Sequence, residues 1–327
     1  MVETKVKSKL TNDKETQETV PVKVFKITDI PQVMENMGWV ESARFMRKWF
    51  NDPYFEMTKQ QKLNRVYMGM IDKHNILDDL NFDWLLTSSS RIKPIYDGFV
   101  REMSNVVEYN ETIGRKKSLL NQLSSGLCFI LNRLENSGFL VDGVFKNAHV
   151  NYNGLSAMEL DKISQFNFIR IGSTLWEKAT DKLDDVYGAL GSFIIKIAFT
   201  DLSIYKEKSG FIRLEINELG LYVRDTYEFM NDGDDQPLGY WGFKGVIKPS
   251  LISEVMNKDY IDKDDERYFR VTNSAFVNYR KKYKADNKTG DFFVYSTVKK
   301  IPVNIIIHLN AIDVEEYLDW KEKNANG

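Results

Sequence analysis

The segment YVRDTYEF, residues 222–229, carries the side chains best suited to acid–base chemistry. Its alternation of apolar and polar residues predicts a β-strand, in which Asp225 and Tyr227 share the face of the apolar Val223. Glu228 then lies on the opposite face. An aspartate held among apolar side chains has a raised pKa, as a catalytic acid or base requires. The alternative is a strand-end aspartate that is hydrogen-bonded to a turn.

The acidic turn between Asp232 and Asp235 has the composition of a cation site. An EF-hand loop needs an oxygen ligand at its third position and glycine at its sixth. With Gly233 at the sixth position the third is Met230, so the EF-hand is excluded. Another kind of cation site and a solvated acidic turn both remain, and a divalent cation stays open as a cofactor. The histidines are too scattered for a zinc motif: His74, His149 and His308.

Three further residues are candidates for binding a phosphate group. Arg280 belongs to a basic run, and its guanidinium can hold an oxyanion through two nitrogens. Asp291 opens the following strand and is expected to reach the same edge, and Lys244 is a second source of positive charge. The alternative for the basic run is a solvated helix end.

Composition argues against several classes of function. The formal net charge of the 327 residues is −2, so no overall charge attracts nucleic acid or an anionic membrane. No segment approaches the roughly 18 consecutive apolar residues of a membrane helix, and the polar N-terminus does not resemble a signal peptide. P-loop, GxGxxG and GxSxG motifs are absent, which argues against common nucleotide enzymes and α/β-hydrolases. Cys128, in an apolar run, is expected to be a buried thiol, and Ser88–Ser90 a loop.

The secondary structure expected around these residues changes along the chain from mainly helical to mainly β. Residues 1–20 read as a disordered tail, and 21–137 as a mainly helical subdomain. A short strand is expected at 20–27, and helices at 29–53, at 58–77, on both sides of a break within 83–107, and at 111–138.

Residues 138–327 read as an antiparallel β-rich subdomain with a helix near 174–190. Strands within 192–205, 210–219 and 220–229 predict a meander, and 290–298 with 302–310 a hairpin. A short helix over 313–323 ends the pattern. The expected fold class is α+β: a mainly helical N-terminal half packed on a C-terminal antiparallel, partly open-barrel sheet, as two packed subdomains.

Four segments taken in order resemble the blocks of a bacterial family of unknown function that is encoded beside type VI secretion genes. They are DIPQVMENMGWVESARFMRKWF, DDVYGALGSFIIKIA, YVRDTYEFMNDGDDQPLGYW and VTNSAFVNYRKKYKADNKTGDFFVYS, and they cover nearly all of the chain after the tail. The family's fourth block ends in Gly-Gly-Asp-Phe followed by Ser-Asp. This chain has Thr289-Gly290-Asp291-Phe292 and then Ser296-Thr297, so one acidic residue is lost.

The residues Asp225-Thr226-Tyr227-Glu228 also resemble the Asp-x-Tyr-Asp motif of colicin M-type toxins, which cleave the lipid-linked peptidoglycan precursor. The His-Arg pair of that motif is missing, and Asp234 and Asp235 stand in its place. The resemblance implies a phosphodiesterase with Asp225, Tyr227 and Glu228 as catalytic residues. Arg280 or Lys244 would then hold the phosphate.

These resemblances lead to two main hypotheses. The first is an antibacterial type VI effector that acts in the recipient's envelope, with a spike or tip protein and a cognate immunity protein as partners. Such a protein is cytoplasmic in the producer and enters the target cell without a signal peptide. The second is a non-enzymatic effector adaptor or immunity-type protein, consistent with the aromatic residues Tyr240, Trp241 and Phe243. Membrane disruption ranks last, because no long apolar helix supports it.

Overall fold

The computed structural model describes residues 24–63, 70–104, 106–109 (backbone only), 126–172, 182–208, 210–230, 235–248 and 258–324. Two long antiparallel strands, β7 (Phe193–Lys206) and β8 (Ile212–Tyr227), form the centre of an eight-stranded sheet. Along the other edge of β8 run β13 (Phe292–Ser296) and β14 (Lys299–Leu309), one after the other.

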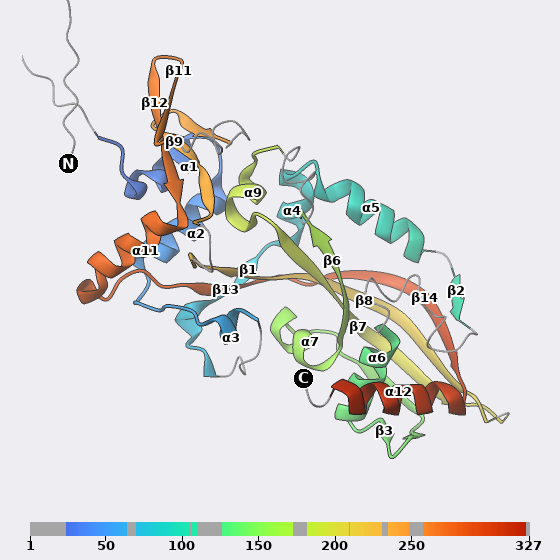
Figure 1. Cartoon of the computed structure of the whole chain (residues 1–327). Helices are drawn as coiled ribbons and strands as arrows, with labels where there is room; N and C mark the ends of the chain where they lie inside the picture. The colour runs from blue at the N-terminus through green and yellow to red at the C-terminus, as the bar shows by residue number, and fades with distance from the viewer. Residues whose placement is uncertain are drawn as a thin grey trace, which may run out of the picture.

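The remaining strands of this sheet widen it on both sides. β5 (Ala148–Asn151) and β6 (Gln165–Ile171) pair with β7 in antiparallel fashion. β1 (Ile76–Leu80) and β2 (Val106–Tyr109) come from the N-terminal half and pair in parallel with β13 and β14. The sheet curls into a half-barrel, with most helices in the N-terminal half (Figure 1), so the predicted α+β class is confirmed.

Two details of the predicted sheet were wrong. The break expected at residue 220 is absent, because Gly220 lies inside the single strand β8. A Cβ at Gly220 would lie 2.9 Å from Val298 Cγ1 and 3.0 Å from Thr200 Cγ2, so this glycine serves close packing and not a turn. The predicted hairpin within 290–310 is absent too, since both of its strands pair with β8. The residues between them lack the turn chemistry of a tight hairpin.

A second, four-stranded sheet has the order β10-β9-β12-β11. Its antiparallel strands are β9 (Pro237–Gly242), β10 (Gly245–Ile247), β11 (Tyr260–Lys263) and β12 (Glu266–Thr272). Tyr240 and Trp241 are buried in it, and Phe243 meets the ring of Phe25 edge-on at 5.4 Å. The aromatic residues expected to form a binding patch therefore belong largely to the interior.

The N-terminal half is mainly helical, as predicted, but with different bounds. Its helices are η1 (Ile27–Asp29), α1 (Ile30–Asn36), α2 (Val40–Asn51), α3 (Lys59–Lys62), η3 (Lys73–Asn75), α4 (Phe82–Ser88) and α5 (Ile92–Met103). The helix expected over 29–53 breaks at Gly38, whose φ is +79°. Residues 24–26 form no strand, and the end of the expected 58–77 helix is β1, where the β-branched and apolar residues pair with β13.

The C-terminal helices connect and cover the strands. They are α6 (Gly126–Asn136), α7 (Ala157–Ile163), α9 (Asp185–Leu190), α11 (Asn273–Lys282), η4 (Lys284–Asp286) and α12 (Ala311–Asn324). A hairpin of β3 (Leu140–Val141) and β4 (Val144–Phe145) follows α6. The first parts of the helices predicted over 111–138 and 174–190 lie outside the described residues, as do residues 1–20.

Helices pack at both ends of the long strands. In Figure 1, α1, α2, α9 and the small sheet lie at one end, and α6, the β3–β4 hairpin and α12 lie at the other. One face of β8 contributes Val223 and Tyr227 to the main apolar core with α2, and the other contributes Tyr222 to a smaller cluster with α7. The alternation of the strand thus decides which chemistry each side chain can reach.

Candidate functional site

Tyr227 lies in the core beneath α2. Its ring stacks on Phe292 with 5.0 Å between centroids and meets Phe45 edge-on at 5.6 Å. The hydroxyl points toward the sulfur of Met46, 3.6 Å away. Burial raises the pKa of the Tyr227 phenol far above its ordinary value. The hydroxyl therefore stays protonated and packed, and is not presented to a substrate.

Asp225 shares that face of β8 and is half-buried. Burial raises the pKa of the Asp225 carboxyl to about 7, opposed by the Thr226 N–H and the Arg224 guanidinium and reinforced by Glu228. A carboxyl with this pKa changes its charge near neutral pH. Asp225 thus has the titration behaviour of a general acid or base.

Glu228 lies on the other side of the strand, together with Arg224. Its carboxylate forms an ion pair with Lys62 at the end of α3. The Arg224 guanidinium lies on the same side, 3.4 Å from the Lys62 carbonyl oxygen. The backbone of β8 thus separates Glu228 from Asp225 and Tyr227, and the three side chains do not converge on one reacting atom.

Arg280 and Asp291 do meet, but inside the molecule. Asp291 is fully buried and Arg280 is 3% exposed, and their side chains form an ion pair. The Trp49 indole N–H donates to one carboxylate oxygen of Asp291 and the Met57 backbone N–H to the other, each over 2.9 Å. Burial raises the pKa of Asp291, whereas the charge of Arg280 opposes that shift. The ion pair and the Trp49 hydrogen bond together connect α11, α2 and the residue before β13.

The backbone around Asp291 is held as tightly as its side chain. The Gly290 N–H donates to the Trp49 carbonyl over 3.0 Å, and the Asp291 N–H to the Phe55 carbonyl over 2.8 Å. A Cβ at Gly290 would lie 2.5 Å from the Pro53 carbonyl oxygen. The Gly-Asp pair of the fourth resembling block thus has a structural reason for both residues.

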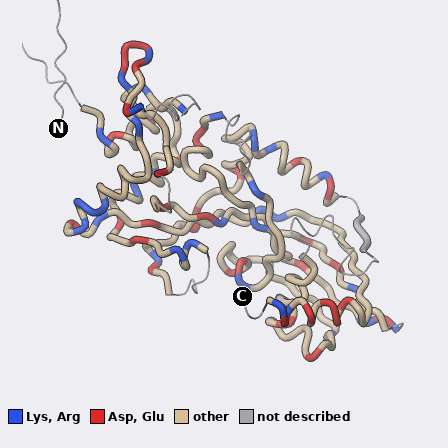
Figure 2. Tube along the Cα trace, in the orientation of Figure 1, with Lys and Arg blue, Asp and Glu red and all other residues tan. Residues whose placement is uncertain are grey.

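Lys244 belongs to the small sheet. It follows β9, and its ammonium donates to the Asp264 carbonyl over 3.1 Å while its backbone N–H donates to the Glu266 carboxylate over 2.9 Å. Both acceptors lie at the charged tip of the β11–β12 hairpin, visible at the upper left of Figure 2. Its partners are therefore those of the hairpin turn, and none of them is a predicted catalytic residue.

A buried polar cluster that no sequence motif predicted lies on the α7 side of the sheet. One carboxylate oxygen of Asp161 accepts from the Tyr222 hydroxyl over 3.0 Å and lies 3.3 Å from the Lys196 ammonium. Burial lowers the pKa of Lys196, which Asp161 opposes, and raises the pKa of Tyr222. The sequence feature that could have indicated this cluster is Lys196, because a lysine inside an apolar strand needs a buried partner.

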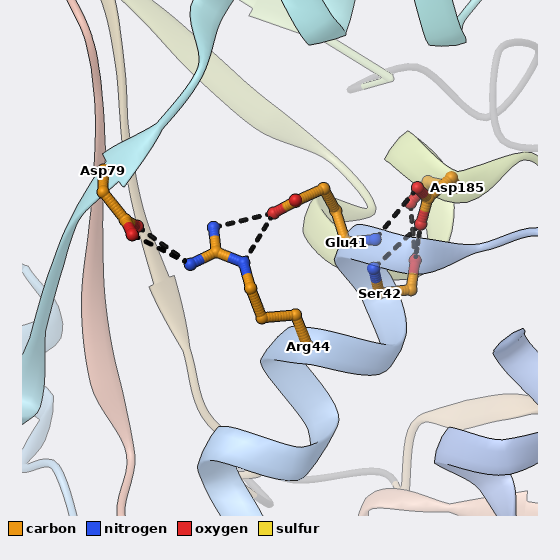
Figure 3. Close-up of polar contacts among 5 residues, drawn as sticks. All are labelled: Glu41, Ser42, Arg44, Asp79 and Asp185. Carbon is orange, nitrogen blue, oxygen red and sulfur yellow. Dashed lines mark hydrogen bonds and ion pairs between the residues drawn. The ribbon is translucent and has the colours of Figure 1, made fainter.

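Two residues of the second resembling block lie where α9 contacts α2, and Figure 3 shows one of them, Asp185. The Asp185 carboxylate accepts from the backbone N–H groups of Glu41 and Ser42, over 3.1 and 2.8 Å, and so caps the first turn of α2 from a distant segment. A Cβ at Gly188 would lie 2.6 Å from the Ser42 hydroxyl and 2.8 Å from the Trp39 ring. Asp185 and Gly188 thus fix how closely these helices pack.

A surface cleft lies away from these residues. A cleft of about 610 Å³ runs along α4, α5 and the segment before α9, and its lining includes Ser88–Ser90, Lys93, Arg101 and Lys182. Ser88 ends α4, and Ser89 and Ser90 lie between α4 and α5. Ser89 donates to Asp184 over 2.7 Å. None of the predicted catalytic or phosphate-binding residues lines this cleft.

The described residues offer no local group suited to a metal ion. No three His, Cys, Asp or Glu side chains among them come together as potential ligands. Asp232 and Asp234 of the predicted acidic turn lie outside the described residues, whereas Asp235 accepts from the Ser274 N–H over 2.8 Å. Within the described ranges, none of the helices is long and apolar enough to span a bilayer.

Comparison with known proteins gives one match. A model of a family of unknown function, DUF6402, matches residues 25–311, which is most of the chain. No curated protein and no solved structure matches it. The matched span contains β8, the Arg280–Asp291 ion pair and the contacts between α2 and α9. The chain therefore belongs to the DUF6402 family.

Proposed function

We propose that this protein is a non-enzymatic binding protein, an effector adaptor that serves a type VI secretion machine. The link to secretion rests on the resemblance of the four sequence blocks. The observation that favours binding over catalysis is the placement of Arg280 and Asp291. These two residues of the implied active site form a buried ion pair that holds the fold together.

Phosphodiester cleavage needs an acid or base and a cation that face one phosphate. In this chain Asp225 and Glu228 lie on opposite sides of β8, and the Glu228 carboxylate is paired with Lys62. The positive charge of Arg280 is neutralised inside the core. The side chains are thus engaged in packing and ion pairs, which suits a scaffold that presents a surface.

The resembling blocks support the same proposal. Asp185 caps α2, Gly188 allows close helix packing, and Gly290 allows close approach of the backbone at Pro53. Asp291 completes the ion pair with Arg280. Each of these residues makes a structural contact, so these positions of the resembling blocks do not require a reaction to explain them.

Co-purification tests the proposal. The full chain is expressed with the spike or tip protein of a type VI locus, and a stable complex is expected, with loss of effector secretion when the chain is deleted. Binding instead to a toxin, with protection of cells from it, would identify an immunity protein. Absence of any complex, together with intact effector secretion, would refute the adaptor function.

A second candidate is the envelope-acting phosphodiesterase effector, which one observation favours: the Asp225 carboxyl has a pKa of about 7. The test is expression of wild type and Asp225→Ala in the periplasm of a sensitive cell. This candidate requires toxicity that Asp225→Ala abolishes, with cleavage of the lipid-linked peptidoglycan precursor by wild type. Equal growth with both forms would eliminate it.

A further inference from the structure

Exposed apolar side chains gather where α12 covers the end of the sheet. Of the thirteen large apolar side chains that are exposed in the described residues, five lie within 126–145 and 311–324: Phe129, Val141, Val144, Ile312 and Leu318. Single exposed apolar residues are ordinary on a protein surface, whereas a concentration of them marks an interaction site. All five belong to α6, the β3–β4 hairpin or α12, which Figure 1 places together.

The β3–β4 hairpin holds two of these valines outward. Val141 and Val144 oppose each other across it, and the next pair, Leu140 and Phe145, is buried. Because side chains alternate along a strand, the two valines must face the solvent. A Cβ at Gly143, in the turn, would lie 3.6 Å from Val314 Cγ1, so the hairpin lies against α12.

α12 presents Leu318 beside this hairpin. Tyr317 is fully buried and donates its hydroxyl to the Glu135 carboxylate, which fixes the rotation of the helix. Leu318 is one residue further on and is exposed. It lies one turn after Val314 on the same side of the helix. Val141, Val144, Val314 and Leu318 form what we call the α12 surface.

Negative charge flanks this surface. α12 contains four carboxylates that are at least partly exposed and two lysines, and Figure 2 shows acidic residues along it. Glu315 and Glu322 are exposed and lie three residues before and four after Leu318, so they border it on the helix. Lys321 is engaged with the Glu135 carboxylate over 2.8 Å. A partner that matches this surface would carry an apolar stripe bordered by positive charge.

We propose that the α12 surface binds a basic amphipathic helix of a partner protein. The apolar stripe of that helix packs on Val144 and Leu318, and its lysines or arginines contact Glu315 and Glu322. An exposed helix face beside a short hairpin is a surface on which a second helix can pack. The proposal rests on the proposed binding function and adds its place and the chemistry of the partner.

Fluorescence anisotropy with the full chain tests the proposal. The probe is a labelled amphipathic helical peptide of leucine and lysine, and its control is the same peptide with glutamate in place of lysine. The leucine–lysine peptide is expected to bind wild type and the glutamate peptide is not. The variants Val144→Ser/Leu318→Ser and Glu315→Lys/Glu322→Lys are each expected to raise the Kd about tenfold or more.

Matched controls change the same residue types elsewhere. Val40→Ser alters an equally exposed valine of α2, and Asp78→Lys reverses an exposed charge of β1. Both should bind like wild type, and circular dichroism should show that all variants are folded. Loss of binding in the controls, or an unchanged Kd in both surface variants, overturns the proposal.

Two other outcomes also overturn it. Failure of the leucine–lysine peptide to bind wild type is one. The other is a concentration-dependent dimer in sedimentation equilibrium that Val144→Ser/Leu318→Ser dissociates, since the surface would then bind a second copy. The two proposals can fail separately. If the spike complex forms while the peptide fails to bind, the proposal for the α12 surface is wrong and the adaptor function stands. If no secretion partner binds wild type although the peptide does, the adaptor function is wrong.

Discussion

At the scale of single residues, the side chains that looked most reactive divide between the core and the surface. Arg280 and Asp291 are buried together, Tyr227 is packed among aromatic rings, and Lys244 holds a turn. Asp225 combines partial exposure with a pKa near neutrality. Residue type and motif indicated possible chemistry, but burial and ion pairing decided what each side chain does.

The Arg280–Asp291 ion pair is expected to be important for stability. Arg280→Ala leaves a buried carboxylate without its counter-charge, so the free energy of unfolding should fall by about 3–5 kcal/mol. Urea unfolding followed by tryptophan fluorescence measures this change. The double variant Arg280→Met/Asp291→Asn removes both charges and should recover much of the loss. An Arg280→Ala variant as stable as wild type would contradict the buried pair.

Asp225 is expected to make stability depend on pH. Its folded pKa of about 7 lies above the unfolded value of about 3.9, so the folded state holds a proton that the unfolded state has released. The free energy of unfolding therefore falls as pH rises between about 4 and 7. Asp225→Asn stays neutral and should exceed wild type by on the order of 2 kcal/mol at pH 8, with little difference near pH 4.

Urea unfolding at both pH values checks this expectation. Asp78→Asn, at an exposed position of β1, is the control and should follow wild type at both. A difference between Asp225→Asn and wild type that does not change with pH would show that Asp225 titrates normally in the folded protein.

At the scale of elements, alternation along the strands was the most reliable signal. It placed Tyr227 on the face of Val223, which the main core cluster confirms, and Glu228 on the other face. Glycine was an ambiguous signal, because Gly220 continues a strand where a break was expected. A glycine required for close packing and a glycine required for a turn look the same in sequence.

Two helical glycines provide a matched pair for this distinction. Gly188→Ala places a methyl group against Trp39 and Ser42 and should lower stability by about 1–3 kcal/mol. Gly98 in α5 has no neighbour within 4 Å of such a methyl, so Gly98→Ala should be neutral or raise stability by up to about 1 kcal/mol. Thermal unfolding of both variants measures the contrast, and equal effects would contradict the close contact of α9 with α2.

At the scale of the whole molecule, the two halves share one sheet. β1 and β2 from the helical half pair with β13 and β14, and the main core contains residues from both. Unfolding of one half should therefore destabilise the other half. We expect one cooperative unfolding transition, with coincident curves from circular dichroism and tryptophan fluorescence and equal calorimetric and van't Hoff enthalpies. Two separated transitions would show that the halves unfold independently.

The sequence by itself determined the fold class, the helical character of the first half and the shared face of Val223 and Tyr227 on β8. These features follow from local periodicity, since the pattern of apolar residues must match the repeat of a helix or a strand. The same patterns could not show that 290–310 runs along one strand edge, or that 76–80 is a strand, because pairing partners are distant in the chain.

Only the tertiary structure decided what the candidate residues do. Asp291 contacts Arg280 and Trp49, and Asp185 contacts α2. Trp49 and α2 are far from their partners in the sequence, so a local sequence pattern cannot predict these contacts. The ion pair between Lys196 and Asp161 also depends on the tertiary structure. Burial and ion pairing depend on all neighbours at once, so a side chain that looks catalytic in sequence can be a structural partner in the folded chain.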